Sequence, residues 1–90
     1  MTGQDSGPRF DPKGPGLVYM LIAGDLAAKI AAGTYPAGGR LPSEAELAEE
    51  YGAAKMTVRR AIRELRERGL AETVYGKGTY VLAPDRRPGH

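Results

Sequence analysis

The stretch that decides the fold is YGAAKMTVRRAIRELRERGL, residues 51–70. It carries six lysines and arginines but only two glutamates, so nearly half of the 13 basic side chains of the chain fall on one segment. Basic residues gathered on a helix are often no more than a solvated face. They are also what a surface needs in order to bind a polyanion. The segments on either side help to decide between these two interpretations.

The apolar residues of this stretch predict a helix from about residue 55 to residue 68. They recur at i, i+3, i+4 and i+7, a spacing that places side chains on one core-facing stripe. The stripe consists of Val58, Ala61, Ile62 and Leu65, and the other side of the helix carries Met56, Arg59, Arg60, Arg63 and Glu67.

A shorter helix is predicted just before it, in LPSEAELAEEYG, residues 41–52. Ser43 and Glu46 have the spacing of a capping box, in which each side chain bonds the other residue's backbone amide. The apolar stripe of this helix comes from Leu47, Ala48 and Tyr51. Gly52 supplies the left-handed turn that ends it. Because only two residues separate Gly52 from Lys55, the helices must cross steeply, as in a helix-turn-helix.

The flanking segments complete the predicted architecture. Upstream, Tyr19, Ile22, Leu26 and Ile30 lie on one helix face. Gly33 is a plausible end for that helix, and TYPAGGR at 34–40 reads as a turn-rich connector. Downstream, the β-prone runs LAETV and TYVL flank YGKG and predict a hairpin with a glycine-bearing turn.

The expected fold is therefore mainly α with a small β-hairpin: a winged helix-turn-helix of three helices plus a wing. We assign this domain to residues 17–82. The glycine- and proline-rich residues 1–16 are expected to form a flexible arm, and residues 83–90 a flexible tail.

Composition excludes several classes of function. The chain has no cysteine and a single histidine, the terminal His90, so we expect neither a metal site nor another cofactor. No apolar run approaches the roughly 20 residues of a membrane span, and the amino end lacks the apolar region of a signal peptide. Charge is unevenly distributed: residues 1–54 carry four basic and seven acidic side chains, a net −3, whereas residues 55–90 carry nine and four, a net +5. This asymmetry indicates one basic face.

The ordered motifs resemble a known family. GRLPSEAELAEEYGAAKMTVRRAIRELRERGLAETVYGKGTYV is similar to the amino-terminal DNA-binding domain of GntR-type bacterial transcriptional regulators, and YMLIAGDLAAKIAAGTYPAG resembles that family's first helix and connector. The hairpin ending favours the HutC-like branch. The resemblance implies a cytoplasmic, nucleoid-associated regulator that is more often a repressor, has no enzymatic activity, and binds double-stranded DNA as a homodimer on an inverted repeat.

The resemblance and the chemistry of the helix together suggest which residues meet DNA. The first turns of a helix in the major groove meet the base edges, and here they carry Lys55, Met56, Thr57, Arg59 and Arg60. Lys55 and Arg59 are the best candidates for reading guanine, and Met56 could pack on a thymine methyl group. Arg60 and Arg63 lie farther round the helix and suit phosphate.

Two further segments are expected to contact the sugar-phosphate backbone. The amino end of the shorter helix, at Ser43, offers amides to a phosphate oxygen. The wing tip is assigned to Tyr75, Gly76, Lys77 and Gly78, where glycine allows close approach and Lys77 is attracted to the minor groove.

The sequence also departs from the family pattern. Alanine stands at Ala45, where an arginine is usual, and at Ala54, where serine or threonine normally caps the recognition helix. Met56 replaces a small hydroxyl residue. These changes affect operator sequence and affinity more than fold. The chain also ends soon after the hairpin, so we expect no small-molecule effector site in it, whether it is a fragment or a naturally short regulator.

The sequence supports other functions less well than DNA binding. GKGT at 76–79 lacks the spacing of a phosphate-binding loop. The acidic cluster Glu44, Glu46, Glu49 and Glu50 is better explained by capping and solvation than by catalysis. Arg66 and Arg68 are interpreted as solvated partners of Glu64 and Glu67. A nonspecific DNA-binding protein and a winged-helix adaptor for another protein stay open as alternatives, although clustered lysine and arginine are uncommon at the centre of a protein interface.

Overall fold

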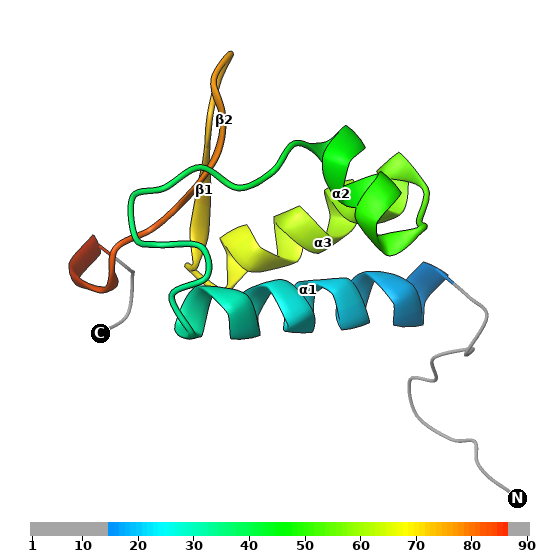
Figure 1. The fold of residues 1–90 in the computed structure, drawn as a ribbon, viewed down its shortest axis with the longest axis horizontal. Coiled ribbons are helices and arrows are strands. Elements are labelled where there is room, and N and C mark those ends of the chain that lie inside the picture. The colour runs from blue at the N-terminus through cyan, green and yellow to red at the C-terminus, as the bar shows by residue number, and fades with distance from the viewer. Residues whose placement is uncertain (1–14, 87–90) are drawn as a thin grey trace, which may run out of the picture.

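A computed structural model of the chain describes residues 15–86. Its elements are α1 (Pro15–Ala31), α2 (Glu44–Tyr51), α3 (Lys55–Glu67), β1 (Ala71–Val74), β2 (Gly78–Val81) and a short 3-10 turn, Pro84–Arg86. The three helices and the hairpin confirm the predicted winged helix-turn-helix (Figure 1). None of the helices in this range is long and apolar enough to cross a bilayer.

Two described elements extend beyond residues 17–82, the range assigned to the domain. The first helix begins two residues before Leu17, and residues 84–86 form a 3-10 turn within the tail that was expected to be loose. Most of the predicted arm, residues 1–14, and the end of the tail, residues 87–90, lie outside the described range.

The core lies where α1 crosses beneath α3, as Figure 1 shows. The predicted α3 stripe, Val58, Ala61, Ile62 and Leu65, is buried, and so are Ile22, Leu26 and Ile30 of α1. Leu41, Leu47, Ala71 and Val81 bring the connector, α2 and the hairpin into the same cluster. This single cluster fixes the orientation of α3, and with it the exposed face that carries the basic residues.

The turn between α2 and α3 has the predicted geometry. Gly52 adopts a left-handed conformation with φ 62°, and its amide bonds to the carbonyls at the end of α2. Ala54 occupies the N-cap of α3 in an extended conformation and makes no side-chain capping bond. The recognition helix therefore begins without the hydroxyl cap that serine or threonine would provide.

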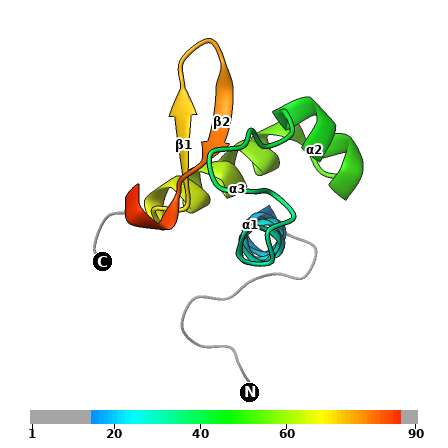
Figure 2. The ribbon, with the colours of Figure 1, turned by 60° about the vertical axis from the view of Figure 1, so that its left-hand side comes forward.

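The hairpin is held on both edges of β2. Its antiparallel register pairs Ala71 with Val81 and Val74 with Gly78. On the other edge, the Leu41 amide donates to the Thr79 carbonyl at 2.8 Å, and the Val81 amide donates to the Gly39 carbonyl at 2.8 Å. The connector from α1 to α2, read from the sequence only as a turn, thus anchors the wing, which projects away from α3 in Figure 2.

Candidate nucleic-acid interface

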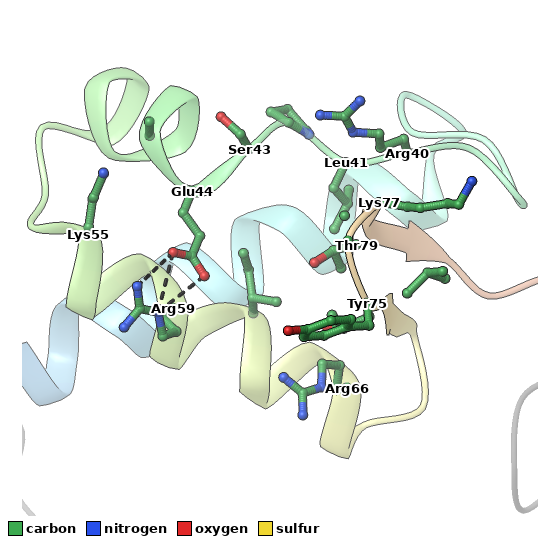
Figure 3. A pocket seen from close by; sticks show the side chains of 17 residues that line it. Arg40, Leu41, Ser43, Glu44, Lys55, Arg59, Arg66, Tyr75, Lys77 and Thr79 are labelled. Carbon is green, nitrogen blue, oxygen red and sulfur yellow. Dashed lines mark hydrogen bonds and ion pairs between the residues drawn. The ribbon is translucent and has the colours of Figure 1, made fainter.

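A groove of about 590 Å³ lies between α3, the segment that leads into α2, and the hairpin. Figure 3 shows cationic side chains around it, contributed by all three walls. The charged residues that line it are Arg40, Glu44, Lys55, Arg59, Arg66 and Lys77. With five cations and one carboxylate, the lining has a net charge of +4, which suits a polyanionic ligand.

Arg59, the expected base reader, lies in this groove beside Glu44. Its Nε is 3.2 Å from Oε2 of Glu44, and its Nη2 is 3.0 Å from Oε1. The hydrogen bonds to Glu44 raise the pKa of Arg59 above its already high value. The Arg59 side chain nevertheless keeps 60% of its surface exposed, so the guanidinium is oriented without being covered.

Ser43 lies at the entrance to α2, where its amide and its hydroxyl oxygen already take part in hydrogen bonds. Its hydroxyl oxygen accepts from the Glu46 amide at 3.0 Å, and its amide donates to Glu46 Oε1 at 2.8 Å, which completes the predicted capping box. The backbone bond from Ser43 is the main cause of a lowered pKa at Glu46. A phosphate at this position would therefore meet the hydroxyl hydrogen of Ser43 or the next amides of the helix.

The wing tip consists of Tyr75, Gly76 and Lys77. Tyr75 is fully exposed, and Gly76 has a positive φ of 78° that the tight turn requires. Gly78 was assigned to the tip from the sequence, but it is the first residue of β2, opposite Val74. Its backbone therefore belongs to the base of the turn rather than to its apex.

The other predicted DNA-contacting residues do not line the groove. Met56 projects from the start of α3 with 70% of its surface exposed. Thr57 is half-buried, and Arg63 is exposed. The Arg60 guanidinium carbon lies 4.3 Å from the centroid of the Tyr19 ring, so Arg60 is directed toward α1.

Two groove residues were absent from the expected site. Arg40 comes from the connector and Arg66 from the last turns of α3. The sequence placed Arg66 with Arg68 on a solvated face; Arg68 does pair with Glu64 at 2.8 Å, whereas Arg66 lines the groove. The seven-residue spacing between Arg59 and Arg66, two helical turns, is the signal that would have placed both on one face.

Comparison with known proteins identifies the fold family. Residues 19–81 match the family described as "Bacterial regulatory proteins, gntR family". The chain is 39% identical over 75 residues to the histidine utilization repressor of Pseudomonas putida, covering 83% of this chain and 30% of that protein. It is 41% identical over 64 residues to the repressor MngR of the mannosyl-D-glycerate transport/metabolism system of Escherichia coli K12, covering 71% and 27%. The chain thus spans less than a third of these relatives.

Solved structures agree with this assignment. A GntR family transcriptional regulator from Listeria monocytogenes superimposes with a TM-score of 0.74 at 37% identity, covering 87% of this chain and 67% of that one. The DNA-binding domain of AraR in complex with operator ORR3 superimposes with a TM-score of 0.70 at 27% identity, covering 90% and 92%. Similarity to histidine utilization repressors also agrees with the HutC-like branch expected from the hairpin. The chain belongs to the gntR family of bacterial regulatory proteins and has the winged helix-turn-helix fold of that family's DNA-binding domain.

Proposed function

We propose that this chain is a sequence-specific binder of double-stranded DNA that regulates transcription as a repressor. The observation that carries the proposal is the basic groove between the recognition helix and the wing, in which the one carboxylate is paired with Arg59. The comparisons support it, because the named relatives are repressors and the AraR domain was solved on its operator.

In this proposal α3 enters the major groove with its amino-terminal turns against the base edges. Lys55 and Arg59 line the protein's basic groove at that end of the helix, and either side chain can donate to both acceptors of a guanine. The exposed side chain of Met56 is available to a thymine methyl group. Lys77 at the wing tip approaches the adjacent minor groove, where the negative potential attracts a cation.

Two arginines that do not line the groove are assigned to the DNA backbone. Arg63 is exposed on α3, and Arg60 lies beside α1, where each can meet a phosphate. Two copies of the chain are expected on an inverted repeat, since twofold symmetry matches paired half-sites. Such a protein acts on chromosomal DNA in the bacterial cytoplasm.

A binding selection on random duplexes of about 30 base pairs, long enough for two half-sites, tests this function. We expect an enriched inverted repeat and a salt dependence that implies several phosphate contacts per copy. Strong salt dependence with no enriched sequence would indicate a nonspecific binder. Absence of binding at low salt would contradict the proposal and favour the adaptor alternative.

A matched pair of variants locates the base reader. Arg59→Ala should weaken binding to the enriched duplex by about 1–3 kcal/mol and relax the preference at one position. Arg68→Ala removes the same charge from a residue that lies outside the groove in an ion pair with Glu64. We expect this control to retain the sequence preference.

A further inference from the structure

Arg40 has a fixed position at the root of the wing. Its neighbour Leu41 donates to the Thr79 carbonyl, and Arg40 itself forms an isolated antiparallel bridge with Tyr80. The connector backbone is thereby paired to β2, which is paired to β1 on its other edge. Arg40 therefore moves with the wing rather than with a free loop.

Gly78 makes room for the Arg40 side chain. A Cβ at this position would lie 3.1 Å from Nε and 3.6 Å from Cδ of Arg40. Gly78 also has φ +126°, a conformation that other residues rarely adopt. Because Gly78 has no side chain, the aliphatic part of the Arg40 side chain can pass close to the start of β2. Figure 3 shows Arg40 and Lys77 on this same side of the groove.

Arg66 completes the opposite wall. It lies seven residues after Arg59 on α3, about 10 Å farther along the helix axis, and both side chains line the groove. Ile62 lies between them on the same face and contributes an apolar floor. The row of cationic side chains on α3 therefore extends toward its carboxyl end, beyond the turns that can reach base edges.

Neither arginine is neutralised within the described residues 15–86, where no ion pair involves Arg40 or Arg66. The Glu46 carboxylate accepts a hydrogen bond from the Ser43 amide in the capping box, which lowers its pKa, and the positive charge of Arg40 lowers that pKa further. Because the cations of the groove outnumber its carboxylates, they repel one another, and their arrangement on facing walls favours an extended anion passing between them.

We propose that Arg40 and Arg66 bind phosphates of the DNA duplex, on whichever of its two strands passes between the recognition helix and the wing. Gly78 positions Arg40 for this contact. The inference rests on the proposed DNA-binding function. A guanidinium can donate two parallel hydrogen bonds to a phosphate, which favours arginine at such positions. Because phosphate contacts carry no sequence information, these residues contribute affinity and register while α3 reads the bases.

The test measures the salt dependence of binding to the selected duplex. Arg40→Gln and Arg66→Gln should each reduce the slope of log affinity against log salt by about 0.9, the contribution of one phosphate contact. Each should also weaken binding roughly tenfold and leave the selected sequence unchanged. The control Arg68→Gln makes the same change in net charge outside the groove, and its slope should match the wild type.

The role of Gly78 is tested with a double-mutant cycle. Gly78→Ala should weaken DNA binding in the wild-type background and have little further effect when Arg40 is already glutamine, with circular dichroism used to verify folding. An equal loss in both backgrounds would mean that backbone strain alone is responsible, and would overturn the positioning role of Gly78.

The outcomes separate this inference from the proposed function. If the wild type selects a sequence but Arg40→Gln and Arg66→Gln keep its salt slope, the phosphate assignment is wrong and the regulator proposal stands. If both variants lose sequence preference as well as affinity, they read bases and the assignment is again wrong. If the wild type binds no duplex, both proposals fail.

Discussion

Glu44 holds Arg59 through both carboxylate oxygens, with Arg59 donating from Nε and Nη2 at 3.0 to 3.3 Å. The pair joins the first residue of α2 to the exposed face of α3. Nη1 takes no part in it, so the arginine retains donors for a ligand. The carboxylate therefore both orients the expected base reader and lowers the positive charge of the groove.

These two effects predict opposite consequences for Glu44→Gln. Loss of the negative charge should raise affinity for random-sequence DNA by about two- to fivefold, the range for an exposed charge interaction. Loss of the bidentate contact should free the Arg59 side chain and reduce discrimination between the selected duplex and a scrambled one. Fluorescence anisotropy with both duplexes measures the ratio of the affinity for the selected duplex to that for the scrambled one.

Glu49→Gln is the matched control, because Glu49 is exposed on the same helix and does not line the groove. It should leave the ratio of specific to nonspecific affinity unchanged. An unchanged ratio in Glu44→Gln itself would show that Arg59 needs no orientation by Glu44.

The contact between Arg60 and Tyr19 links the recognition helix to α1. A cation over an aromatic face contributes about 0.5–1 kcal/mol at an exposed site. We expect that coupling energy from a double-mutant cycle of Tyr19→Leu and Arg60→Met, measured by urea unfolding. Tyr19→Phe keeps the ring and should retain most of the coupling. A coupling energy of zero would mean that the two side chains are merely adjacent.

Restoring the cap of α3 should stabilise the protein. Ala54 is exposed and extended, and it makes no capping bond. In Ala54→Ser the hydroxyl oxygen can accept a hydrogen bond from a first-turn amide, which should raise the free energy of unfolding by about 1 kcal/mol. Ala28→Ser is the control, since Ala28 is exposed inside α1, where serine slightly lowers helix propensity. Equal changes in urea midpoint for the two variants would contradict the capping argument.

The elements that could be predicted from the sequence are those specified by local patterns. The Val58–Leu65 stripe, the capping box of Ser43 and the turn at Gly52 depend on residues within a few positions of one another. The pairing of the connector with β2 joins segments about 40 residues apart, and Gly38 and Gly39 carry no strand signal of their own. Nonlocal pairing of this kind leaves little trace in a single sequence.

The same distinction applies to the candidate site. Lys55 and Arg59 could be placed from the helix start alone, because the leading turns of a recognition helix face the ligand. Arg66 faces the groove because the hairpin folds back beside it, and Arg60 faces Tyr19 because α1 crosses α3 there. Both placements depend on how elements pack, which periodicity does not specify.

A polar cluster between α1 and α2 should make stability depend on pH. The Tyr51 hydroxyl donates to Asp25, and Lys29 pairs with Asp25 at 3.3 Å and with Glu50 at 3.2 Å. The bond from Tyr51, followed by that from Lys29, holds the pKa of Asp25 below its usual value. Burial, followed by the bond to Asp25, raises the pKa of Tyr51 to about 12.

The signs of these shifts give two pH windows. Asp25 is more acidic in the folded state, so its stabilisation is present above about pH 4 and is lost as pH falls through its lowered pKa. Tyr51 is less acidic in the folded state, so its stabilisation is present below about pH 10 and is lost as pH rises toward 12. Urea unfolding followed by circular dichroism across both windows measures the two losses.

Tyr51→Phe separates the two contributions, because it removes the titrating phenol and the donor to Asp25 while keeping the ring. The variant should lose less stability between pH 10 and 12 than the wild type. Its loss of stability in acid should also be smaller and should end nearer the ordinary pKa of an aspartate, about 3.9, because the folded-state pKa of Asp25 moves back toward that value. Tyr75→Phe is the control, since Tyr75 is fully exposed at the wing tip. If Tyr51→Phe and Tyr75→Phe gave the same pH profile, the Tyr51–Asp25 bond would not contribute to stability.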